Sequence, residues 1–233
     1  MGLYSFHYSY FLYMLPALVL SVAAQIWVHS SFQKYSRVGN AKGITGEEAA
    51  WQVLHFGGVM GVRVQPIAGN LTDHFNPSTK IIGLSQPVYG QASIAAVGVA
   101  AHEAGHAVQH ARGYLPIKIR TALVPAVNIG SRFSIPLIML GLLLPVQYTV
   151  VVYIGMGLYG LAVLFSLVTL PVEFNASRRA LQALRETRTL SPVELSDARK
   201  VLTAAAMTYV ASTLTALLSL VRLASIVHAR RGR

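Results

Sequence analysis

FSIPLIMLGLLLPVQYTVVVYIGMGLYGLAVLFSLVTLPV, residues 133–172, contains no charged residue in forty positions. A helix that crosses a bilayer needs about 20 mostly apolar residues, so this stretch predicts two membrane-spanning helices that turn near Pro145-Val146-Gln147. Two further stretches without charged residues cover residues 1–33 and 201–221. We therefore expect a mostly α-helical integral membrane protein with about four transmembrane helices.

The composition supports this class. The 233 residues are 54% hydrophobic and only 12% charged, which is about half the charged share of a soluble domain. The chain has no cysteine, which excludes disulfide bonds, thiolate metal sites and a cysteine nucleophile. Its formal net charge is +11, but the basic residues flank the apolar stretches. We attribute them to membrane topology and to contact with the lipid bilayer, and expect no nucleic-acid partner.

The basic residues also indicate an orientation. Lys34, Arg37 and Lys42 follow the first apolar stretch, so the positive-inside rule places residue 34 onward in the cytoplasm. No lysine or arginine precedes that stretch, which favours an uncleaved anchor over a cleaved signal peptide. We expect one membrane-embedded domain over residues 1–233, with a first span over 8–28, a cytoplasmic segment over 34–132, a hairpin of two spans over 133–172, a polar helix over 173–200 and a last span over 202–227.

The cytoplasmic segment shows local signals for helices and short strands. Thr45 and Glu48 form a capping-box pattern that predicts a helix start, and Gly57-Gly58 predicts its end. The other elements expected in this segment are a strand over residues 59–67, a turn-rich segment over 71–78, a strand over 80–84, and a helix over 93–111 that is closed by Gly113.

Residues 102–106, within that last helix, read His-Glu-Ala-Gly-His. Positions four apart lie one turn apart on the same helix face, so His102 and His106 can bind one Zn²⁺. Glu103 stands at the edge of this face, where it can take a proton from a metal-activated water. Two histidines and a glutamate on an apolar helix are costly without a partner, which favours a metal site over two structural histidines.

A catalytic zinc takes a third protein ligand and keeps its fourth position open for water. Glu173 stands out because it directly follows the apolar stretch, where a carboxylate needs a compensating cation. It could be a metal ligand or an interfacial glutamate paired with Arg178 or Arg179. The remaining acidic residues are Glu47, Glu48, Asp73, Glu186, Glu194 and Asp197.

Together these motifs resemble the YugP-like neutral zinc metallopeptidases, bacterial membrane proteins related to HtpX-type peptidases and to the CAAX prenyl-protein endopeptidases. The matching segments cover residues 71–77, 84–85, 88–89, 93–96, 100–109 and 172–181. The resemblance implies a zincin-like unit of gluzincin type, in which His102, His106 and Glu173 hold one Zn²⁺ per chain and Glu103 is the general base.

The resemblance also implies a bacterial inner-membrane protein with several spans, an active site on the cytoplasmic side, and a protein or peptide substrate. HtpX-like enzymes carry an aspartate four residues after the ligand glutamate, where this chain has Ser177. The group that orients a zinc histidine therefore stays open between Ser177 and Asp73.

Three further features are weaker candidates. His74 or Tyr89 could stabilise a tetrahedral oxyanion, or could only hold a loop in place. The short strand near residue 82 could present a free edge to which a substrate backbone adds. The residues of that expected substrate strand are Ile81, Ile82, Gly83 and Leu84.

Two other function classes compete with a zinc endopeptidase. A membrane di-iron oxygenase could use four histidines near the bilayer, His74, His102, His106 and His110. Such enzymes need more histidines than the five available outside the other apolar stretches. A zinc-bound scaffold would not require Glu103, and a transporter would place ionisable groups inside its spans. We expect a membrane zinc endopeptidase; the sequence names neither a regulatory partner nor an oligomeric state.

Overall fold

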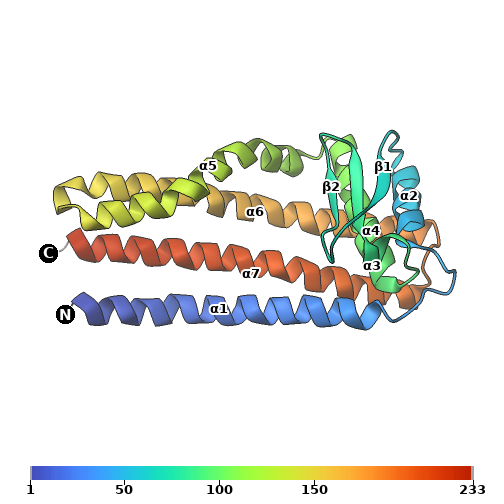
Figure 1. The fold of residues 1–233 in the computed structure, drawn as a ribbon, viewed down its shortest axis with the longest axis horizontal. Helices are drawn as coiled ribbons and strands as arrows, with labels where there is room; N and C mark the ends of the chain where they lie inside the picture. Colours follow the sequence, from blue (N-terminus) through green and yellow to red (C-terminus); the bar gives the residue numbers. More distant parts are fainter. Residues whose placement is uncertain (1, 232–233) are drawn as a thin grey trace. The chain divides into compact units, whose positions relative to one another are not determined.

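The computed structural model describes residues 2–231, with side chains described for residues 11–229. The fold is mostly helical with one small sheet, which confirms the expected fold class (Figure 1). Its elements in chain order are α1 (Gly2–Tyr35), α2 (Gly46–Gly57), β1 (Arg63–Ile67), β2 (His74–Asn76), β3 (Ile81–Ser85), α3 (Gln86–Tyr89), α4 (Ile94–Ala111), α5 (Leu115–Leu143), the 3₁₀ turn η1 (Val146–Tyr148), α6 (Thr149–Glu186) and α7 (Pro192–Arg231).

Four helical segments of the described chain are long and apolar enough to cross a membrane. They are Phe11–Tyr35, Leu115–Leu143, Val146–Glu186 and Pro192–Ala229. Only 11% to 22% of the most apolar stretch in each segment is buried inside the protein. Side chains such as Leu143 and Phe133 are exposed, so these faces need an apolar surrounding, as a bilayer provides.

The helix bounds differ from the expected spans. Helix α5 begins at Leu115, well before residue 133, and includes Lys118, Arg120 and Arg132. Lysine and arginine are good helix formers, so these basic residues do not end the helix. The expected turn near residues 145–147 is confirmed, since η1 separates α5 from α6.

The expected polar helix over residues 173–200 is not a separate element. Glu173 lies inside α6, which continues through Pro171 and ends at Glu186. The break comes later, where Arg188 adopts a left-handed conformation (φ 52°). Helix α7 then begins with a capping box, in which the Glu194 carboxylate accepts the Ser191 N–H at 2.7 Å. Helix termination thus depends on the backbone at residues 187–191 and not on the proline.

The chain divides into two compact units. The first consists of Met1–Ala24, Ile119–Leu170 and Thr208–Arg233, and the second of Gln25–Lys118 and Pro171–Met207. In the first unit Ile138, Val152 and Val227 form a buried cluster. There Ser21 also exchanges a hydrogen bond with Thr215, with 3.1 Å between the hydroxyl oxygens.

The second unit contains a three-stranded sheet in the order β1-β3-β2. Strand β3 pairs in parallel with β1 and antiparallel with β2, with Ile82 opposite Val64 and Phe75. Helices α2 and α4 pack together, and β2 and β3 contact α4. Buried Leu54 and Val97 belong to the core that these elements share.

The local signals in this unit are largely confirmed. Thr45 and Glu48 make the reciprocal capping box of α2, and Gly58 ends it in a left-handed conformation. The first expected strand is shorter, since β1 begins at Arg63 and not at residue 59. The turn-rich segment contains an unexpected strand, β2, whose three residues are too few for a periodic sequence signal.

Candidate metal centre

Helix α4 carries the two histidines of the motif. It begins after Ser93, whose hydroxyl accepts the Ala96 N–H at 3.1 Å. The chain leaves it at Gly113, which has a positive φ of 64° that glycine adopts without strain. His102 and His106 lie one turn apart, with 4.7 Å between ring centroids and 84° between ring planes. The helix therefore turns two imidazoles toward the same space.

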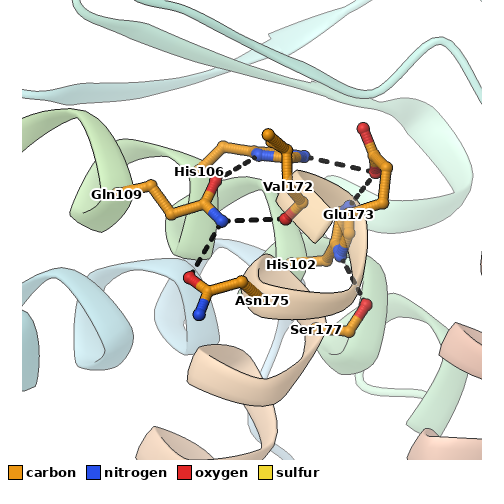
Figure 2. A network of polar contacts seen from close by, with 7 residues as sticks. All are labelled: His102, His106, Gln109, Val172, Glu173, Asn175 and Ser177. Carbon is orange, nitrogen blue, oxygen red and sulfur yellow. Dashed lines mark hydrogen bonds and ion pairs between the residues drawn. The ribbon is translucent and has the colours of Figure 1, made fainter. Parts of the chain in front are cut away.

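Glu173 of α6 reaches this space from the other side (Figure 2). Its Oε2 atom lies 3.2 Å from His102 Nε2 and 3.5 Å from His106 Nε2. Among the described residues, these three are the one group of histidine, cysteine and acidic side chains whose ligand atoms all lie within 4.8 Å of one another.

The distances from Glu173 to the two histidines fit a zinc ion. Bonds of about 2.0–2.1 Å in tetrahedral geometry place two zinc ligands roughly 3.4 Å apart, close to the two distances from Glu173. His106 and Glu173 are buried, with 8% and 2% of their surface exposed. A buried carboxylate needs a positive partner, and a bound divalent cation would supply one. Two imidazoles and a carboxylate are also donors that zinc prefers.

A close contact between helices brings the candidate ligand residues together. A Cβ added at Gly105 would lie only 2.6 Å from the carbonyl oxygen of Ala176. Gly105 precedes His106 on α4, and Ala176 lies three residues after Glu173 on α6. The missing side chain therefore lets the helix turns that carry His106 and Glu173 pack backbone against backbone.

Both histidines use their second ring nitrogen for a hydrogen bond. His102 Nδ1 lies 3.0 Å from Ser177 Oγ, and His106 Nδ1 lies 3.0 Å from Gln109 Oε1 (Figure 2). Such contacts orient the imidazole of a metal ligand and set which nitrogen faces the metal. Here they leave both Nε2 atoms directed at Glu173.

Glu103 lies beside the three candidate ligand residues and acts on His106 through its charge. It is partly exposed and, within the described part of the chain, makes no hydrogen bond or ion pair. Its charge nevertheless acts on His106. Burial lowers the pKa of the His106 imidazole, but the carboxylates of Glu173 and Glu103 and the amide of Gln109 outweigh burial and hold that pKa above its ordinary value. The carboxylate of Glu103 is thus close to the candidate centre but makes no described hydrogen bond or ion pair with its residues.

Comparison with known proteins indicates a family of zinc peptidases. Residues 10–228 match the family described as "Putative neutral zinc metallopeptidase". The chain belongs to this family. It is also 43% identical over 212 residues to the "Putative membrane protease YugP" of Bacillus subtilis (strain 168), covering 91% of this chain and 93% of the relative. No protein of known structure matches the chain.

In this chain, Ser177 and not Asp73 lies beside a histidine of the candidate centre. Asp73 accepts the backbone N–H of Ser85 at 2.7 Å and its hydroxyl at 3.0 Å. That contact joins the segment before β2 to the end of β3. The expectation that Asp73 could orient a histidine is therefore wrong, while Ser177 lies in contact with His102.

His74 and Tyr89 have local partners. His74 Nδ1 lies 2.9 Å from the carbonyl oxygen of Thr72. Tyr89 hydrogen-bonds to the Glu47 carboxylate of α2, and this bond, with burial and the charge of Glu47, raises the pKa of the phenol. These contacts hold the loop before β2 and the end of α3. A role of either residue toward an oxyanion stays a prediction.

The expected substrate strand does not have a free edge. Ile81, Ile82, Gly83 and Leu84 lie in β3, the central strand, which pairs with β1 on one side and β2 on the other. Residues 82–85 are also buried. The sequence-based prediction is wrong because it did not include β2, whose pairing occupies one of the two edges.

Two further residues near the centre, Gln109 and Asn175, are not among the candidates that the sequence indicates. Gln109 is completely buried, and its Nε2 donates to Asn175 Oδ1 at 3.0 Å. Spacing held a partial signal, because Gln109 is three residues after His106 and therefore lies on the same face of α4. No local pattern indicates Asn175, since its contact with α4 arises only when the two helices pack.

Proposed function

We propose that this protein is a membrane-bound zinc endopeptidase that hydrolyses peptide bonds of membrane or membrane-proximal proteins. The observation that carries the proposal is the convergence of three ligand atoms, from His102, His106 and Glu173, beside the unengaged carboxylate of Glu103. The two histidines and Glu173 would hold one zinc ion, and Glu103 would act as general base.

A bound zinc ion would act as a Lewis acid that lowers the pKa of its own bound water to near 7 and polarises the carbonyl group of the substrate. Glu103 would accept a proton from the attacking water while the water oxygen bonds to the scissile carbonyl carbon. The C–N bond then breaks, and Glu103 passes the same proton to the leaving amine nitrogen. The carboxylate suits this task because it is partly exposed and makes no described contact that would have to break first.

Strand β2 offers the best place for a substrate backbone. It is an edge strand of the sheet, and it contacts α4, the helix of the two histidines. An extended peptide could add to this edge through main-chain hydrogen bonds. We therefore propose recognition that depends on the substrate backbone and tolerates many side chains.

The proposed location is the bacterial inner membrane, with the active site on the cytoplasmic side. Lys34, Arg37 and Lys42 support this orientation through the positive-inside rule. The absence of cysteine makes a direct test possible. Ser78→Cys should resist a membrane-impermeant thiol reagent in intact cells, whereas Gln147→Cys, in the turn between α5 and α6, should react. The opposite pattern would reverse the orientation.

Glu103→Gln tests the function itself. Purified wild-type protein should contain about one zinc per chain and cleave a fluorescent casein or a membrane-anchored reporter peptide. The variant should keep its zinc and lose most activity, because glutamine cannot accept the proton; loss of a general base typically costs about 10²–10⁴-fold in rate. Equal cleavage by both proteins would overturn the role of Glu103. A wild-type protein that binds iron instead would overturn the zinc peptidase.

A further inference from the structure

Gln109 is a buried polar residue whose amide is fully used. Its Nε2 donates to the carbonyl oxygen of Val172 at 2.8 Å and to Asn175 Oδ1 at 3.0 Å, and its Oε1 faces His106 Nδ1 (Figure 2). A backbone carbonyl can only accept, so the NH₂ end of the amide must face Val172. The oxygen end must therefore face the histidine.

This orientation determines the protonation of the ring. A carbonyl oxygen accepts but does not donate, so His106 Nδ1 must carry the hydrogen in the contact with Gln109. In a neutral imidazole Nε2 then has a free lone pair. That lone pair faces Glu173 Oε2, itself an acceptor, at 3.5 Å. Neither of these two atoms can donate a hydrogen bond to the other, but both can donate a lone pair to a metal ion placed between them.

The donors of this network meet at Asn175, whose Oδ1 accepts from both Gln109 and Arg179. Arg179 Nε donates to Asn175 Oδ1 at 2.7 Å, and an arginine can only donate, so the oxygen of Asn175 must be the end that Arg179 and Gln109 share. The guanidinium of Arg179 also lies 5.9 Å from the centroid of the Tyr114 ring, a cation–π distance. Each hydrogen bond in this network, from Arg179 to His106, thus has only one possible direction.

We propose that Arg179, Asn175 and Gln109 form a directional hydrogen-bonded relay that keeps His106 in its Nδ1-protonated form, with Nε2 free to bind the metal. The proposal rests on the proposed zinc function. These three are positioning residues and do not touch the reacting atoms. Because Gln109 also bonds to Val172, next to Glu173, the relay fixes the distance between a ligand of α4 and a ligand of α6.

His102 has no such constraint. Its Nδ1 contacts Ser177 Oγ at 3.0 Å, and a hydroxyl can either donate or accept. The contact therefore orients the ring without selecting the nitrogen that carries the hydrogen. The relay thus predicts that loss of Gln109 weakens zinc binding more than loss of Ser177.

Zinc affinity of the full-length protein in detergent, measured by competition with a chromophoric chelator, tests the relay. Gln109→Leu should lose about 10- to 100-fold, the usual effect of removing a group that supports a metal ligand. Gln52→Leu is the matched control, since it removes a hydrogen bond to Thr189 elsewhere in the same unit and should leave affinity unchanged.

Asn175 separates the direction of the relay from simple packing. Asn175→Asp keeps an oxygen acceptor for both Gln109 and Arg179 and should stay within about threefold of wild type, whereas Asn175→Leu should lose affinity as Gln109→Leu does. In protein labelled with ¹⁵N-histidine, the metal-free wild type should show His106 protonated at Nδ1, assigned by the signal missing in His106→Ala. Gln109→Leu, which removes the acceptor at His106 Nδ1, should show a mixture of the two tautomers.

Three results would overturn the relay: wild-type zinc affinity in a folded Gln109→Leu, equal loss in Asn175→Asp and Asn175→Leu, or an Nε2-protonated His106 in the neutral wild-type ring. If Gln109→Leu does not fold, the two Asn175 variants decide. A wild-type protein without zinc affinity would instead overturn the proposed function, so the two failures are distinguishable.

Discussion

At the scale of single residues, Glu173 has the strongest requirement for a partner. Its carboxylate is 2% exposed and lies within 3.5 Å of both imidazoles. Glu173→Gln keeps the shape but removes the charge. We expect it to lose zinc by more than the roughly 10- to 100-fold that loss of a supporting contact costs. Metal content per mole of purified protein measures this, and zinc retained at one per chain would exclude Glu173 as a ligand.

Ser177 offers a test in the opposite direction. A carboxylate that accepts from a ligand histidine increases the basicity of that ligand, and Ser177 holds the corresponding place beside His102. Ser177→Asp should therefore bind zinc more tightly, by about tenfold, and Ser177→Ala more weakly. Chelator competition on both variants and the wild type measures the order of their zinc affinities. An aspartate variant that binds no better than the alanine variant would show that the 3.0 Å contact does not influence the metal centre.

At the scale of elements, the approach of α4 to α6 depends on Gly105. Gly105→Ala would place a methyl group 2.6 Å from the Ala176 carbonyl oxygen, so the helices must separate and the ligand atoms with them. We expect zinc affinity to fall by at least about tenfold and stability to fall by about 1–3 kcal/mol, the usual cost of overpacking. Chelator competition measures the zinc affinity, and thermal unfolding of the zinc-loaded protein measures the stability.

Gly98→Ala on the same helix is the control for that substitution. Its new methyl group would meet Ala198 at an ordinary 3.7 Å. Alanine also favours a helix interior over glycine by about 0.8–1 kcal/mol. The control should therefore keep its zinc and melt at the same or a higher temperature. Loss of zinc in both variants would show that α4 does not tolerate alanine for reasons unrelated to the contact with α6.

The elements that sequence could predict are those decided by near neighbours. The capping box of Thr45 and Glu48 and the spacing of His102 and His106 each involve residues at most four apart, and the structure contains both as expected. Strand β2 depends on pairing with β3 across a turn, and three residues carry too little pattern for that. For this reason the sequence predicts a free edge at residues 81–84, whereas β3 is the central strand.

At the scale of the whole molecule, one unit contains every residue of the candidate centre. His102, His106 and Gln109 come from Gln25–Lys118, and Glu173 and Asn175 from Pro171–Met207. The two segments are far apart in the chain, so the centre exists only in the folded unit. The sequence alone could therefore give the two histidines, but the contact of Gln109 with Asn175 required the packed helices.

Because the ligands meet only on folding, zinc should stabilise the protein, and pH should set by how much. The pKa of His106 is raised in the metal-free protein. The ion pair of His106 with Glu173, 3.5 Å apart, therefore contributes stability below a pH of about 6.5, the ordinary histidine pKa. That contribution is lost as the pH rises through the raised pKa of the folded state.

Zinc must displace this proton to bind. At pH 6 zinc must replace the ion pair between protonated His106 and Glu173. At pH 8 His106 is deprotonated in a larger fraction of the molecules, so zinc displaces fewer protons. The increase in melting temperature that excess zinc produces should consequently be larger at pH 8 than at pH 6. His106→Ala removes the titrating group and should show a small zinc effect at both values. A zinc effect in the wild type that is equal at the two pH values, or larger at pH 6, would contradict competition between the proton and the metal at His106.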